Sequence, residues 1–268
     1  MSHHRPWKYV LAVCALAITT AIAATSASAT IRHDVSPKPT IVLVHGAFAD
    51  GSSWDAVIAG LQEQGYPVVA VANPLRDLNG DAAYLSSVLS AISGPVILVG
   101  HSYGGEVITD GAGGDPNVKA LVYIAAFAPD EGESAVSILS RFPGSKLAPA
   151  LIVRPVRGCT EAYIDPTQFR AVFAADLPLA ITNIMAADQR PVCVAALETP
   201  SGPPAWKTLA SWYLVAGADQ AIPPAAEEFM AQRAHAHTKE VPGASHAVLI
   251  SHPDRVIELI DEAASAVG

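Results

Sequence analysis

The sequence predicts an α/β protein: a mostly parallel, doubly wound sheet of about six strands with a small helical cap. Three observations predict this class. From residue 40 onward, short β-branched runs alternate with longer segments of helical period. Several of the runs are apolar throughout, which is typical of parallel strands buried on both faces. With 51% hydrophobic and 15% charged residues in 268, the chain can also form a substantial core.

The expected strands, in chain order, cover residues 40–44, 68–71, 96–99, 118–124, 212–216 and 238–241. The segments between them have helical period. Trp54, Val57 and Leu61 share one face of a first helix, and residues 84–92 contain a second apolar stripe. A last helix begins near Pro253, because proline fits the first turn of a helix.

The alternation of strands and helices stops between about residues 130 and 210, where Pro and Gly are frequent and no clear strand appears. Helical fragments at residues 167–174 and 179–187 indicate a small helical cap over the strand ends. We therefore expect residues 131–209 to form a cap, inserted into a core made of residues 30–130 and 210–268.

The N-terminal residues have the pattern of a secretory signal peptide. Arg5 and Lys8 precede an apolar run over residues 9–24, and small residues follow it up to Ala29. The alternative is a membrane anchor, but the run is short for a span and no basic stop signal follows it. We expect cleavage after Ala29 and a secreted or periplasmic protein without a stable membrane anchor.

Residues 1–29 contain two basic and no acidic residues, so the mature chain has 14 basic and 25 acidic residues and a net charge of −11. Such a charge makes nucleic acid a poor partner. The mature chain keeps two cysteines, Cys159 and Cys193, both within the expected cap. In an oxidising compartment this pair is a candidate disulfide, and two separate buried thiols are the alternative.

The segment Gly100-His101-Ser102-Tyr103-Gly104 follows an expected strand and precedes an expected helix. At such a sharp turn the glycines relieve crowding, and the serine hydroxyl projects from the end of the sheet. The alternative is an ordinary glycine-rich turn. We expect Ser102 to be a nucleophile.

A serine hydroxyl needs a base to accept its proton during attack, and histidine is the usual base. His246 is the candidate, because it lies in the loop after the last expected strand, at the sheet edge where Ser102 emerges. Asp219 follows the preceding strand and is the candidate carboxylate that orients the base. Asp130 competes with Asp219 for this role, and Asp219 could instead be an ordinary turn residue.

The negative charge that develops on an attacked carbonyl requires backbone N–H donors. Gly46 lets the chain turn inward after the first strand, so the N–H groups of Ala47 and Tyr103 can converge on one point. We expect these two amides to form an oxyanion hole, and His45 to be structural.

Four segments together resemble the α/β-hydrolase superfamily, over a region from about Thr40 to the C-terminus. They are Val44-His45-Gly46-Ala47-Phe48 with the residues up to Trp54, Gly100-His101-Ser102-Tyr103-Gly104-Gly105, Asp219 before Ile222-Pro223-Pro224, and Ser245-His246. Within the superfamily the chain is similar to the small esterase branch that contains salicylate-type esterases and hydroxynitrile lyases. The resemblance implies a triad of Ser102, Asp219 and His246, with Ala47 and Tyr103 as oxyanion donors.

Two features separate the chain from related activities. Plant hydroxynitrile lyases of this branch have a lysine directly after the catalytic histidine, whereas Ala247 follows His246 here. A serine nucleophile likewise disfavours the haloalkane dehalogenase and epoxide hydrolase reactions, which use aspartate.

The leading hypothesis is hydrolysis of a small-molecule carboxylic ester through an acyl-enzyme, without a cofactor. Two alternatives stay open: a cofactor-free haloperoxidase or perhydrolase with the same triad, and a hydrolase-like binding protein with little turnover. A metal site is not expected, because His235 and His237 have no acidic or cysteine cluster beside them. The candidate substrate-pocket residues, for which plain core packing is the alternative, are Phe48, Phe127, Met185 and Trp206.

Overall fold

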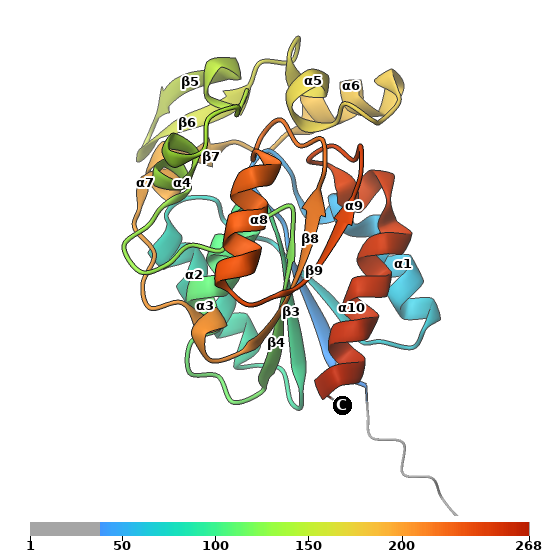
Figure 1. Cartoon of the computed structure of the whole chain (residues 1–268). Helices are drawn as coiled ribbons and strands as arrows, with labels where there is room; N and C mark the ends of the chain where they lie inside the picture. Colours follow the sequence, from blue (N-terminus) through green and yellow to red (C-terminus); the bar gives the residue numbers. More distant parts are fainter. Residues whose placement is uncertain (1–37, 268) are drawn as a thin grey trace, which may run out of the picture. The chain divides into compact units, whose positions relative to one another are not determined.

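The computed structural model describes residues 38–267, so the expected signal peptide, residues 1–29, lies outside the described residues. A six-stranded sheet with the order β2-β1-β3-β4-β8-β9 forms the centre, and every neighbouring pair is parallel (Figure 1). The strands are β1 (Thr40–Val44), β2 (Val68–Val71), β3 (Val96–His101), β4 (Val118–Ile124), β8 (Ala210–Ala216) and β9 (His237–Val241). The predicted fold class is confirmed.

Alternating side chains of each central strand pack into two different hydrophobic clusters. Ile41 and Leu43 of β1 belong to the cluster with α1 and α10, whereas Val42 and Val44 belong to the cluster with α2 and α3. Because helices cover both faces, the inner strands β1 and β3 consist mostly of buried apolar residues, whereas the edge strand β9 is polar and largely exposed (Figure 1). The helices outside the cap are α1 (Asp55–Glu63), α2 (Leu78–Leu89), α3 (Tyr103–Gly111), α8 (Pro224–Arg233), α9 (Val248–Ser251), α10 (Pro253–Val267) and the 3₁₀ turns η1 (Gly51–Trp54) and η3 (Ala205–Lys207).

Most of the expected cap, the elements from α4 to α7, lies towards the carboxyl ends of the strands and contains a second sheet as well as helices, whereas η3, also within residues 131–209, packs against α3 of the core (Figure 1). Strands β5, β6 and β7 pair in an antiparallel sheet, so the expectation of a cap without strands was wrong. The cap elements are α4 (Ala135–Arg141), η2 (Ala148–Ala150), β5 (Leu151–Val156), β6 (Cys159–Ile164), α5 (Phe169–Phe173), α6 (Leu179–Asp188), β7 (Val192–Cys193) and α7 (Val194–Glu198).

These cap strands lack the sequence pattern of a buried strand for identifiable reasons. Four of the six β5 residues are exposed, and β5 contains Pro155, which cannot donate a ladder hydrogen bond. Strand β7 is only two residues long. Arg154 and Pro155 interrupt the apolar residues of β5, so this strand does not show the continuous run or regular alternation of a buried strand.

Cys159 and Cys193 form a disulfide, with their Cα atoms 5.8 Å apart, as predicted. The bond joins the start of β6 to the end of β7 and so fixes the small sheet covalently. In the described part of the chain, none of the helices combines the length and the apolar character needed to cross a bilayer.

Candidate active site

Ser102 occupies a strained turn between β3 and α3. Its φ is 54° and its ψ is −125°, a conformation that a residue with a side chain rarely adopts. The turn is tight enough that a Cβ on Gly46 would lie 2.6 Å from the Ser102 Cβ, and one on Gly100 would lie 2.6 Å from the Gly104 carbonyl oxygen. The glycines of this motif are therefore needed for the close approach of two chain segments.

His246 lies in the loop between β9 and α9 and contacts the carboxylate of Asp219. Its Nδ1 is 2.5 Å from Asp219 Oδ2, and the two residues are 1% and 2% exposed. A carboxylate only accepts, so Nδ1 carries the proton and Nε2 keeps its lone pair. The contact fixes the orientation of the His246 ring and leaves Nε2 as the nitrogen that is not bound to Asp219.

The loop after β8 holds the Asp219 side chain firmly. Its Oδ1 accepts hydrogen bonds from the N–H groups of Ala221 at 2.6 Å and Ile222 at 2.9 Å, which leaves Oδ2 to the imidazole. The competing carboxylate, Asp130, instead forms an ion pair with Lys207 at 2.5 Å. Of the two carboxylates considered as partners of the base, Asp219 is therefore the one that contacts His246.

His101, the residue before Ser102, contacts His246 directly. The two histidine rings are 4.7 Å apart, and His101 Nε2 donates to the His246 carbonyl oxygen at 3.0 Å. Burial, with His246 beside it, holds the pKa of His101 well below its usual value, so this ring is neutral. Within residues 38–267, no hydrogen bond joins the Ser102 hydroxyl to His246 itself.

Two amides near Ser102 have no acceptor among the described residues: the N–H of Ala47 and the N–H of Tyr103, the first residue of α3. Phe48, the next residue after Ala47, has a φ of 61° and donates its own N–H to Arg190. The chain therefore turns sharply directly after Ala47. Burial lowers the pKa of neighbouring His45 to about 4, as expected of a neutral structural histidine.

Sequence reasoning missed Glu227, a carboxyl group on α8 behind Asp219. Glu227 is fully buried, and its Oε2 accepts the N–H of Ala216 at 3.0 Å. Burial, and then the Asp219 carboxylate beside it, raises the pKa of Glu227 well above its usual value. A neutral Glu227 avoids placing two negative charges side by side. In the sequence, only the position of Glu227 in the first turn of the helix after Asp219 could have indicated that the two carboxyl groups are close.

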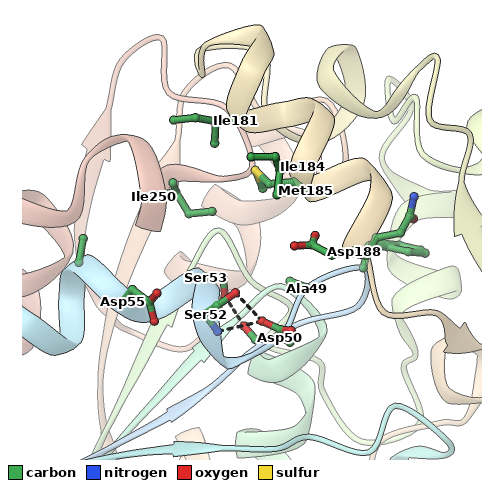
Figure 2. A pocket seen from close by; sticks show the side chains of 13 residues that line it. Ala49, Asp50, Ser52, Ser53, Asp55, Ile181, Ile184, Met185, Asp188 and Ile250 are labelled. Atoms are coloured by element: carbon green, nitrogen blue, oxygen red, sulfur yellow. Dashed lines mark hydrogen bonds between the residues drawn. The ribbon is translucent and has the colours of Figure 1, made fainter.

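A cavity of about 290 Å³ lies between the residues after β1 and helix α6 of the cap. Figure 2 shows Ile181, Ile184 and Met185 of α6 on one side and the Asp50–Ser53 turn on the other. Two of the four predicted pocket residues, Phe48 and Met185, line this cavity.

The other two predicted pocket residues lie elsewhere. The Trp206 ring nitrogen donates to the Pro129 carbonyl at 2.8 Å, and the Phe127 amide donates to the Ser102 carbonyl at 3.1 Å. Both side chains are buried in the core cluster and neither lines the cavity. The described residues contain no group of three or more His, Cys, Asp or Glu side chains arranged to hold a metal ion.

Comparison with known proteins places this arrangement in a family. The pyrethroid hydrolase of Sphingobium wenxiniae is 28% identical over 263 residues, which cover 84% of this chain and 88% of that protein. A carbendazim hydrolyzing esterase of Nocardioides sp. is 34% identical over 140 residues, 46% of this chain and 55% of that esterase. The crystal structure of polyneuridine aldehyde esterase has the same fold, with a TM-score of 0.73, 18% identity and coverage of 84% of this chain and 99% of that one.

The family model described as "Alpha/beta hydrolase family" matches residues 41–259, which include every strand of the central sheet except the first residue of β1. The chain belongs to the alpha/beta hydrolase family, as the resemblance of its motifs predicted, and its named relatives are hydrolases and esterases.

Proposed function

We propose that the protein is a carboxylic ester hydrolase in which Ser102 is the nucleophile, His246 the general base and Asp219 the group that orients the base. The observation that carries this proposal is the buried 2.5 Å contact between His246 Nδ1 and Asp219, beside a serine with positive φ. That contact fixes the tautomer whose Nε2 can accept the serine proton.

The reaction follows in two steps. His246 accepts the proton of Ser102 as the hydroxyl oxygen attacks the ester carbonyl, and then donates it to the departing alcohol, which leaves an acyl-enzyme. A water molecule loses a proton to His246 and attacks the acyl carbon, and the acid departs as Ser102 recovers its proton. Asp219 stays ionised and stabilises the imidazolium in both steps.

The amides of Ala47 and Tyr103 are the proposed oxyanion donors. Both N–H groups lack an acceptor among the described residues, and Tyr103 begins the helix that follows the nucleophile. Each such donor contributes a few kcal/mol to transition-state stabilisation when it is aimed at the developing charge.

The cavity is lined by Phe48, next to Ala47, but not by Ser102 or His246, and we propose that it receives the part of the substrate beyond the ester group. The substrate that fits it best is an uncharged ester with an apolar portion. Isoleucine, methionine and phenylalanine side chains supply the apolar lining, and the charged lining residues are all carboxylates: Asp50, Asp55 and Asp188. An anionic substrate would be repelled there, whereas a neutral apolar group would be desolvated favourably. The related enzymes named for pyrethroid and carbendazim hydrolysis are compatible with such a substrate.

A labelling experiment tests the nucleophile. The mature protein is incubated with a serine-directed fluorophosphonate, the adduct is located by mass spectrometry, and hydrolysis of p-nitrophenyl acetate and butyrate is measured in parallel. We expect the label on Ser102, and a loss of kcat of about 10⁴-fold or more in Ser102→Ala. Ser87→Ala, which removes an exposed serine of α2, serves as the control.

Unlabelled protein without turnover would contradict the proposal and favour the binding-protein alternative. Labelled protein that makes peracid from hydrogen peroxide and a carboxylic acid faster than it hydrolyses esters would favour the perhydrolase alternative.

We also propose that the protein is exported. The leader over residues 1–29 and the Cys159–Cys193 disulfide both suit an oxidising compartment. Intact-mass measurement of the protein from the medium or periplasm should show an N-terminus at Thr30, whereas an intact leader on the isolated protein would contradict cleavage.

A further inference from the structure

The loop that carries His246 is held on both sides by the cap. The N–H of Ser245, just before His246, donates to Asp176 Oδ2 at 3.1 Å, and the Ser245 hydroxyl donates to Asp176 Oδ1. The N–H of Ala247, just after His246, donates to the carbonyl oxygen of Phe173 at 2.9 Å. Phe173 ends α5 and Asp176 lies in the loop before α6, so both partners are cap residues.

The same cap segment also contacts the imidazole. The Phe173 ring packs edge-on against His246, with ring centroids 4.8 Å apart, and lies 6.1 Å from the His101 ring. Phe173 is 2% exposed, so this packing excludes water from one side of the base.

Asp176 is suited to accept both Ser245 groups. Burial disfavours its charge, but hydrogen bonds, first those from Ser245 and then one from Ser251, outweigh burial and hold the pKa of Asp176 below its usual value. An ionised carboxylate has two acceptor oxygens, one for each Ser245 donor. His252 Nδ1 is the other titratable group facing it, at 3.8 Å.

We propose that Asp176 is a positioning residue, through which the cap sets the orientation of the His246 loop and hence the catalytic competence of the core. This inference rests on the proposed function of His246 as the base. Asp219 restrains the imidazole from one side, and Asp176 restrains the backbone that carries it. The cap would then do more than cover a pocket, because moving it would move the base.

The test compares Asp176→Ala and Asp176→Asn with a matched control, Asp165→Ala. Asp165 is also a cap aspartate that accepts a backbone N–H and a hydroxyl, but both belong to Thr167 and neither is near His246. We expect Asp176→Ala to lower kcat for p-nitrophenyl acetate about tenfold or more, because small displacements of a catalytic group are costly. KM should stay within about twofold, and Asp176→Asn, which keeps one acceptor oxygen, should restore most of the loss.

A double-mutant cycle with Ser245→Ala gives a second measurement. If Asp176 acts through Ser245, the double variant should lose less activity than the product of the two single losses. Ser245→Ala keeps the backbone N–H, so the cycle measures the part of the effect that passes through the hydroxyl. An unchanged kcat in Asp176→Ala would overturn the proposal, as would a loss that Asp165→Ala reproduces or that falls entirely on KM.

Wild-type labelling separates this inference from the proposed function. If the fluorophosphonate does not label Ser102 in the wild-type protein, the proposed function has failed. If the wild-type protein is labelled and Asp176→Ala is labelled at the same rate, only the positioning role has failed.

Discussion

The core and the cap are stabilised by different kinds of contact. All six residues of β3 are buried, whereas four of the six residues of β5 are exposed. The core is stabilised by apolar side chains buried on both faces of its sheet, and this close packing fixes the positions of the strand ends. The cap relies more on discrete ties: one disulfide, an ion pair between Arg76 and Glu161, and hydrogen bonds to the His246 loop. Ser102, Asp219 and His246 therefore all lie on loops at the ends of core strands, whereas the cap contacts them through a small number of hydrogen bonds and one ring contact.

Removing the charge of Asp219 should give the largest effect, because it acts inside the core. Asp219→Asn would place an amide N–H₂ or a weaker acceptor at Nδ1 of His246, favouring the wrong tautomer. We expect kcat for p-nitrophenyl acetate to fall about 10³- to 10⁴-fold with little change in KM. Asp130→Asn, at the competing carboxylate, is the control and should lose less than about threefold. Equal losses in both variants would break the assignment.

Removing the disulfide should test the cap as a separate unit. The bond spans 34 positions, so Cys159→Ser with Cys193→Ser should lower the free energy of unfolding by about 3 kcal/mol. Activity at a temperature where the protein stays folded should fall much less than in Asp219→Asn, because neither cysteine touches the site. Calorimetry together with p-nitrophenyl acetate kinetics measures both quantities. A loss of activity as large as that of Asp219→Asn would show that the core depends on the cap as strongly as on its own triad.

The same contrast explains what could be predicted from the sequence. Strands such as β1 and β3 are apolar runs because both their faces are buried, and the turn at Ser102 needs glycines that are visible as a motif. Strand β5 is apolar in composition, but Arg154 and Pro155 interrupt the run and four of its six residues are exposed, so it lacks the pattern of a buried strand. Asp176 could not be assigned either, because its partner Ser245 is 69 positions away in the chain. Glu227 is only 11 positions from Ala216, but an isolated carboxylate has no characteristic spacing.

The apolar lining of the cap should affect selectivity more than rate. Met185→Ala removes part of the cavity lining, so kcat/KM for a bulky apolar ester should fall about tenfold, while kcat/KM for p-nitrophenyl acetate stays within about twofold. Leu179→Ala is the matched control, because Leu179 is on the same helix, is 62% exposed and does not line the cavity. Steady-state kinetics with a graded ester series measures the ratio. A uniform loss for every ester would place the effect of Met185 on the catalytic groups instead of on binding.

Glu106 is an ionisable group inside the apolar core, and it should make the stability of the protein depend on pH. Glu106 lies on α3, is fully buried, and neither of its carboxyl oxygens has a hydrogen-bond partner among the described residues. Burial, and then the nearby Asp110 carboxylate, raises the pKa of Glu106 well above its usual value. The folded protein therefore binds a proton that the unfolded chain releases at about pH 4.5.

The sign of the pH dependence follows from this difference. Stability from neutral Glu106 is fully present below the unfolded pKa and is lost as pH rises toward the folded pKa, by about 1.4 kcal/mol for each pH unit in that window. Glu106→Gln cannot ionise, so its Tm minus that of the wild-type protein should increase from pH 5 to pH 8. Glu63→Gln, at an exposed glutamate of α1, is the control and should show no such increase. A constant difference between Glu106→Gln and wild type across this range would mean that the core accommodates a charged Glu106 without loss of stability.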